Sequence, residues 1–160
     1  MMKDQISKNF TLSELTRSDT ANKLHIDNKN SLSEEQYNNL VSLCENLLQP
    51  IRDKINKPIK INSGFRCSKL NEAVKGAKTS QHLKGQAVDM EIIGMSNYDF
   101  ACWIRDNNFD FDQLILEFAD NLKNDINSGW VHISYNSKEK NRHQCLTINK
   151  RIGTKIGLLK

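Results

Sequence analysis

The hydrophobic positions of this chain follow two patterns, one with a period of two residues and one with a period of three to four. Alternation of apolar and polar residues indicates a half-buried strand, whereas apolar residues three and four apart mark one face of a helix. Strands are predicted at 57–64, 87–93, 112–118 and 130–134. The longest helix is predicted to begin at Ser31 or Ser33 and to run to about Leu48. Pro50 follows, so this helix either ends there or continues with a kink.

The remaining segments are shorter and less periodic. They are predicted as helix at 68–73 and 96–104, as loop at 16–31, and as one further strand at 145–148. Helices gathered around a small, mainly antiparallel sheet define an α+β fold. A length of 160 residues fits a single domain spanning 1–160, with a basic C-terminal segment from about residue 138.

Composition narrows the class of protein. Hydrophobic residues make up 38% and charged residues 26%, and the apolar residues are clustered, so a folded domain is expected rather than a disordered chain. No run of 18 apolar residues is present, so we expect no membrane span. The first seven residues lack the apolar core of a signal peptide, so we expect synthesis in the cytoplasm. The four cysteines form no Cys-x-x-Cys pair and are expected to be reduced packing residues. We also expect a monomer.

The net charge of +4 arises mainly from the C-terminal segment. Seven lysines and arginines against one glutamate lie between residues 138 and 160. Such an excess fits a solvated surface, a face for nucleic acid, or attraction to an anionic cell wall. We expect no nucleic acid partner, because no recognised binding motif occurs and aromatic residues are not interleaved with the basic ones.

The stretch from Ser80 to Asp89 is typical of a metal site. His82 and Asp89 are both first-row metal ligands, and Gly85 between them marks a tight turn. A spacing of seven would also place the two on one helical face, but Gly85 and the β-branched Val88 favour a loop that enters a strand.

A catalytic zinc takes three protein ligands and keeps a fourth position open. His132 is the best candidate for the third ligand. In the strand 130–134 the period of two sends Trp130, His132 and Ser134 to one face and two aliphatic residues to the other. A strand that lines a site should carry polar and aromatic side chains on one face and apolar side chains on the other.

These motifs resemble those of the zinc D-alanyl-D-alanine carboxypeptidase family, which includes peptidoglycan carboxypeptidases and phage endolysins. The resemblance rests on Ser80, His82, Gly85, Ala87 and Asp89, followed by Trp-Val-His at 130–132. It extends to Ser-Gly-Phe-Arg at 63–66, to Leu-Asn at 70–71 and loosely to 10–15, so it covers most of residues 10 to 134. It implies a hedgehog/DD-peptidase-like fold and one zinc ion per chain.

The resemblance also implies roles for other residues. Arg66 would lie near the carbonyl or carboxylate of the substrate, where a planar guanidinium is better suited than lysine. Ser80 and Gln81 would either bind substrate or orient His82. His25 and His143 lie in polar and basic segments and are interpreted as surface residues.

The general base is where this chain departs from the family. One branch carries a glutamate three residues before the last histidine ligand and another carries His-x-His, but here Gly129 and Trp130 occupy those positions. Glu117 is our replacement, because strand alternation places it on the face of Gln113, from which it could reach the metal. Asp120 and Asp125 are the fallback candidates, and a surface role for Glu117 is the alternative.

Three functions remain in view, and a basic nucleic-acid-binding protein is the least supported of them, because no binding motif occurs. The first is a zinc peptidase that cleaves peptidoglycan stem peptides, either at D-Ala-D-Ala or at L-Ala-D-Glu, and acts on the cell wall after release as a phage or prophage lysis enzyme. The second is a non-catalytic zinc-binding module of the same fold, as the hedgehog signalling domain shows that this fold can also serve partner binding. The presence or absence of a general base distinguishes the peptidase from the non-catalytic module.

Overall fold

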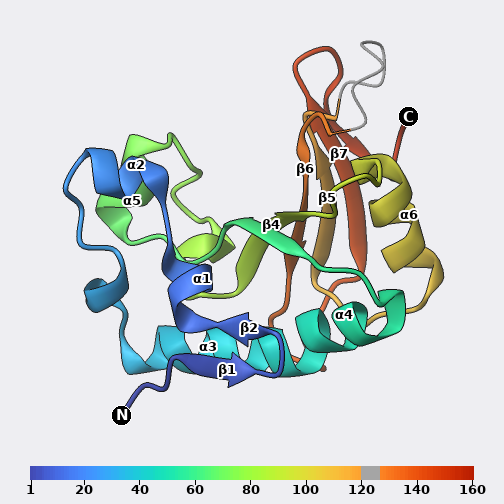
Figure 1. The fold of residues 1–160 in the computed structure, drawn as a ribbon. Coiled ribbons are helices and arrows are strands. Elements are labelled where there is room, and N and C mark those ends of the chain that lie inside the picture. The colour runs from blue at the N-terminus through green and yellow to red at the C-terminus, as the bar shows by residue number, and fades with distance from the viewer. Residues whose placement is uncertain (120–126) are drawn as a thin grey trace.

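A mixed sheet forms the centre of the computed structural model, which describes residues 1–119 and 127–160. Within these residues the sheet has six strands in the order β3-β4-β6-β5-β7-β8 (Figure 1). The strands are β3 Lys60–Ser63, β4 Ala87–Glu91, β5 Gln113–Glu117, β6 Trp130–Ser134, β7 Gln144–Asn149 and β8 Gly153–Ile156. β5 and β7 run parallel, and the other neighbours are antiparallel. The predicted α+β class and mainly antiparallel pairing are both present.

Helices and a small second sheet surround these strands. The helices are α1 Leu12–Thr16, α2 Asp19–Lys23, α3 Glu34–Leu43, α4 Gln49–Ile55, α5 Ser68–Ala73 and α6 Asn97–Asp106. Single helical turns occur at η1 Lys29–Ser31 and η3 Gln81–Lys84, a π-helical turn at η2 Cys44–Leu48, and a two-stranded sheet at β1 Gln5–Ser7 and β2 Phe10–Thr11. In Figure 1, α6 lies beside β5, whereas α2 and α5 lie at the opposite side of the molecule.

The long helix continues through the proline. Ser33 is its N-cap, and the helix runs through α3, η2 and α4 to Ile55, so of the two predicted alternatives the chain follows the continuation past Leu48. Pro50 has no N–H and would clash with the preceding turn of a regular α-helix. The π-helical turn η2 directly before α4 loosens the backbone at this point, so the helix passes the proline without ending.

Gln36 connects the start of this helix to the turn η3. Its side-chain oxygen accepts a hydrogen bond from the Ser33 N–H at 2.8 Å, which completes a capping box. Its side-chain nitrogen donates to the Leu83 carbonyl at 2.8 Å. One amide therefore holds both the first turn of α3 and a turn 47 residues further along the chain.

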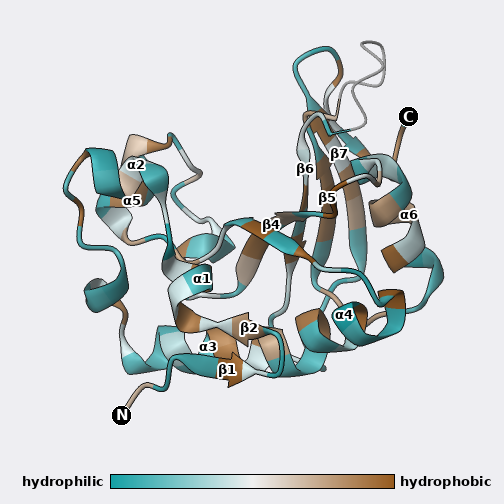
Figure 2. Ribbon diagram, in the orientation of Figure 1, coloured by the Kyte–Doolittle hydropathy of each residue, from teal (hydrophilic) through white to brown (hydrophobic). Residues whose placement is uncertain are grey.

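The hydrophobic core lies between one face of the sheet and the helices. Strand residues Leu114, Leu116, Val131 and Ile133 are at most 1% exposed and belong to the same core cluster as Phe100 of α6. Figure 2 shows hydrophobic colour along these strands and on parts of the helices. Each fully buried aliphatic side chain contributes about 1.5–3 kcal/mol. The other face of the same strands is free to carry polar side chains.

Several elements differ from the predicted pattern. The loop predicted at 16–31 contains α2 and η1, and the pair β1–β2 and the strand β8 were not predicted. In α2 only Ala21 is buried, so no apolar stripe marks the helix; its start is fixed locally by the Ser18 hydroxyl, which accepts from the Ala21 N–H. All four residues of β8 are exposed, so no alternation marks that strand.

Among the described residues, no helix is long and apolar enough to cross a membrane.

Candidate metal centre

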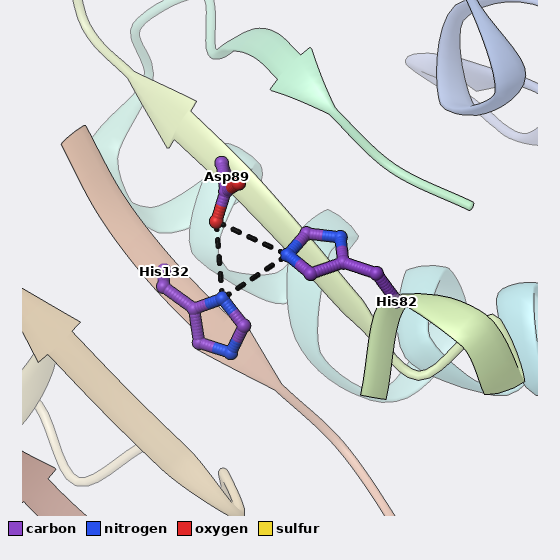
Figure 3. A group of neighbouring side chains, drawn as sticks. All are labelled: His82, Asp89 and His132. Atoms are coloured by element: carbon purple, nitrogen blue, oxygen red, sulfur yellow. Dashed lines mark hydrogen bonds and ion pairs between the residues drawn. The ribbon is translucent and has the colours of Figure 1, made fainter. Parts of the chain in front are cut away.

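Three side chains converge on the polar face of the sheet. Asp89 on β4 and His132 on β6 are direct cross-strand partners, and His82 reaches toward them from η3 (Figure 3). His82 Nε2 lies 3.2 Å from His132 Nδ1 and 3.3 Å from Asp89 Oδ1, and the last two atoms are 3.0 Å apart. All three residues are buried. The structure therefore brings together the three residues that the sequence selected as ligands.

The triangle of donor atoms has dimensions that suit a small tetrahedral metal. Donors bound to zinc at about 2.0–2.1 Å lie about 3.3 Å from one another. The three observed separations, 3.0 to 3.3 Å, come close to this value. Two imidazoles and one carboxylate are also a common donor set for a catalytic zinc with an open position. The residues present therefore fit such a metal.

Backbone contacts set the direction of the His82 ring. Its Nδ1 donates to the Gly64 carbonyl at 2.7 Å, which leaves Nε2 as the free acceptor facing Asp89 and His132. Gly85 ends the turn in the left-handed conformation, with φ of 68°. A Cβ at Gly85 would lie 2.5 Å from the Gln36 carbonyl oxygen, so the turn packs too closely on α3 for another residue.

The electrostatics of the cluster favour the deprotonated donors that a metal requires. Burial alone would raise the pKa of Asp89, but the neighbouring imidazoles, first that of His82, outweigh it and hold this pKa well below its usual range. Burial lowers the pKa of His82, against the opposing effect of Asp89. At neutral pH the site therefore contains a carboxylate and a neutral imidazole at these positions.

Glu117 lies beside the triangle. The antiparallel pair β5–β6 places Ile115 opposite His132 and Glu117 opposite Trp130. Glu117 Oε1 is 3.8 Å from His132 Nδ1. Burial, and then the negative charge of Asp89, raise the pKa of Glu117, while His132 and Arg66 act in the opposite direction. The carboxylate is thus near the donors without belonging to the triangle.

Arg66 is half-buried near the same cluster. Its backbone N–H donates to the His82 carbonyl at 3.2 Å. Burial lowers the pKa of its guanidinium, while the charges of Asp89 and Glu117 raise it. Within the described residues, its Nε is buried and has no hydrogen-bond partner. A cationic donor with unused hydrogen-bonding capacity therefore lies next to the carboxylates of the site.

Ser80 and Gln81 hold the turn that carries His82. The Ser80 hydroxyl accepts from the His82 N–H at 3.3 Å and caps η3. The Gln81 side chain donates to Asp112 Oδ2 at 2.9 Å. Asp112 in turn is paired with Arg142. Burial alone would raise the pKa of Asp112, but the hydrogen bonds from Arg142 and Gln81 outweigh it and lower this pKa.

Sequence reasoning missed the residues that act through long-range hydrogen bonds. Asp112 is one, and Asn28 is another. The buried Asn28 side chain donates to the Thr16 and Phe65 carbonyls and accepts from the Cys67 N–H, so it fixes the segment that contains Arg66. A lone asparagine in a polar stretch gives no local signal of such a role.

The other predicted candidates lie elsewhere. His25 is exposed, and the exposed His143 is paired with Asp110 at 2.8 Å. Asp120 and Asp125, the fallback candidates for the base, lie outside the described residues.

Comparison with known proteins adds an independent finding. A model of the family described as peptidase M15 matches residues 8–134. A zinc D-Ala-D-Ala carboxypeptidase from Streptomyces albus G is 37% identical over 83 residues, which are 51% of this chain and 31% of that protein. The similar region therefore spans about a third of that relative.

Proposed function

Because the chain belongs to the peptidase M15 family, we propose that it is a zinc-dependent peptidase that hydrolyses amide bonds in the stem peptides of peptidoglycan. The observation that carries this proposal is the triangle of His82, Asp89 and His132, whose donor atoms lie 3.0 to 3.3 Å apart. The similarity to a zinc D-Ala-D-Ala carboxypeptidase supports both the metal and the class of substrate.

His82, Asp89 and His132 would hold the zinc ion through Nε2, a carboxylate oxygen and Nδ1. Zinc at this position supplies a Lewis acid for the scissile carbonyl and lowers the pKa of a bound water from about 16 to about 7. The side chains of Asp89 and His132 are still 12% and 10% exposed, so the site opens to solvent on one side. Substrate and water can reach the site from that side.

Glu117 is our candidate for the general base. A carboxylate 3.8 Å from a ligand atom can hydrogen-bond a water at the open position, directly or through one more water. It would accept the proton of the attacking water and later donate it to the leaving amine. Its raised pKa suits this exchange, since a base works best when its pKa lies near the working pH. Glu117 on β5 would thereby provide the general base that Gly129 and Trp130, at the positions where the family carries it, cannot provide.

Arg66 would bind the carbonyl or the terminal carboxylate of the substrate. Among the residues that the structure describes, its buried Nε has no hydrogen-bond partner, and this supports the role because a bound carboxylate would offer an acceptor. Ser80 and Gln81 are proposed to support His82, since the hydrogen bonds described above run to the backbone of its turn and to Asp112. A direct substrate contact of either residue remains part of the proposal.

Two bonds of the stem peptide are candidates for cleavage. They are the D-Ala-D-Ala bond and the L-Ala-D-Glu bond. We further propose that the enzyme serves a phage or prophage in lysis and reaches the wall after release from the cytoplasm. The basic C-terminal segment would favour contact with an anionic wall.

The test is digestion of purified peptidoglycan, with the released fragments identified by mass. Release of free D-alanine from pentapeptides indicates the carboxypeptidase, and a new N-terminal D-Glu indicates the endopeptidase. Activity should disappear with a chelator and return with zinc. A chain that binds one zinc but releases no fragment would be the non-catalytic module, and a chain without zinc would refute both.

A further inference from the structure

Asp112 is a buried carboxylate outside the metal cluster. It is 1% exposed and lies just before β5. Arg142 donates to it three times, from the backbone N–H at 3.0 Å, from Nε at 2.8 Å and from Nη2 at 2.7 Å. The two guanidinium bonds form the bidentate geometry that is strongest between arginine and a carboxylate. Asp112 is thus fixed from one side by the C-terminal segment.

A further hydrogen bond of the Asp112 side chain connects it to the turn η3. Gln81 Nε2 donates to Asp112 Oδ2 at 2.9 Å, and Gln81 directly precedes the ligand His82. An ionised carboxylate can only accept hydrogen bonds, so the amide of Gln81 has a single possible orientation. The backbone of the same residue accepts from the Gln86 N–H at 3.0 Å, so both ends of the turn are held through Gln81.

We propose that Asp112, held by Arg142, is a positioning residue for the metal centre: it fixes Gln81 and with it the turn η3, so that His82 is already oriented toward Asp89 and His132 before the metal binds. Asp112 does not touch metal or substrate. Its contribution is to reduce the freedom that His82 loses when the ion is bound.

The proposal gives the C-terminal segment a role at the metal site. The family match ends at residue 134, whereas Arg142 follows it and β7 pairs in parallel with β5. Phe118, next to Glu117, donates its N–H to the Ile148 carbonyl at 2.8 Å. The segment from 138 onward is therefore attached beside the site through Arg142 and through β7, in addition to any attraction to the cell wall.

The inference rests on the proposed function only in that zinc is taken as the metal, and the experiment measures zinc affinity rather than activity. The zinc dissociation constant of the full chain is measured by competition with a coloured chelator, for wild type and for Asp112→Asn, Arg142→Lys and Gln81→Met. Groups that orient metal ligands typically change affinity 10- to 100-fold. Because Asp112 acts through Gln81, we expect the zinc dissociation constant to rise about tenfold in each variant, at the lower end of this range.

A double variant separates positioning from general destabilisation. If Asp112 acts through Gln81, the combined Asp112→Asn and Gln81→Met change raises the dissociation constant no further than either change alone. Ile51→Ala, in α4, is the matched control: Ile51 is fully buried, so its truncation lowers thermal stability, but we expect the zinc affinity to stay within twofold.

The outcomes are distinct. If Arg142→Lys and Gln81→Met both bind zinc with a dissociation constant within twofold of wild type, the positioning role is overturned. This test holds even if Asp112→Asn fails to fold. The positioning role would also be overturned if Ile51→Ala lost as much zinc affinity as the variants at Asp112, Arg142 and Gln81, since reduced stability alone would then explain the effect. A wild-type chain that binds no zinc would overturn the proposed function together with this inference.

Discussion

Replacement of Glu117 by glutamine tests the assignment of the general base. The amide has nearly the shape of the carboxylate, but it cannot accept the proton of the attacking water. Glu117 Oε1 lies 3.8 Å from His132 Nδ1 and is not one of the three donors of the triangle. The variant should therefore fold and bind zinc, with a dissociation constant within about tenfold of wild type, while the chemical step is impaired.

The size of the effect follows from the surroundings of the carboxylate. A positioned general base contributes about 10²- to 10⁴-fold, or about 3 to 5 kcal/mol. The Glu117 side chain is 19% exposed, so bulk water has limited access to replace it as a proton acceptor. We therefore expect kcat on a stem peptide to fall about 10³-fold, with little change in KM.

Glu91→Gln provides the matched control. Glu91 lies on β4, two residues after Asp89, and its side chain is 18% exposed, nearly the same as that of Glu117. Its carboxylate pairs with Lys60 instead of approaching the triangle. Both variants lose one negative charge near the site, so an effect of charge alone would appear in both. A Glu117→Gln enzyme that keeps wild-type turnover, or a Glu91→Gln enzyme equally impaired, would refute the reasoning.

Three further changes test other parts of the structure. His132→Ala should lose zinc and all peptidase activity while the domain stays folded, as checked by metal analysis and circular dichroism; unchanged metal content would exclude His132 as a ligand. Arg66→Lys keeps the charge but loses the planar fork, so kcat/KM should fall about tenfold or more with zinc still bound; wild-type activity would make Arg66 a structural residue. The folded-state pKa of Asp112 lies below its unfolded value of 3.8. The contribution of the ionised Asp112 to the free energy of unfolding is therefore fully present above pH 3.8, and it is lost as the pH falls through the lower, folded-state pKa. Denaturant unfolding should accordingly show the stability difference between wild type and Asp112→Asn shrink below about pH 4; a constant difference would contradict the ion pair with Arg142.

Local sequence patterns predicted much of the fold and of the candidate site. The period of two located β6 at Trp130–Ser134 and put Glu117 on the face of His132, because alternation is a property of the extended backbone itself. Gly85 indicated the turn before β4. The roles of these residues in metal binding and catalysis remain predictions.

Other features depend on contacts between distant residues, which no local pattern records. The carbonyl that orients His82 belongs to Gly64, 18 residues earlier, and Arg142 meets Asp112 across 30 residues. β8 could not be recognised because all its residues are exposed. The continuation of the long helix through Pro50 required the π-helical turn, which the spacing of apolar residues does not reveal.

The double contact of Gln36 couples two distant parts of the chain. Fraying of the first turn of α3 would take away the side chain that holds the Leu83 carbonyl, and release of that carbonyl would remove one restraint on the amide that completes the cap. We therefore expect local opening of the helix start to loosen the turn η3 as well, so that hydrogen exchange of the amide protons in the two segments is coupled. Gln36→Glu would weaken this coupling, because a carboxylate still accepts from the Ser33 N–H but cannot donate to Leu83. The hydrogen bond from the Asn39 side chain to the Lys84 carbonyl would remain as the second link between α3 and η3.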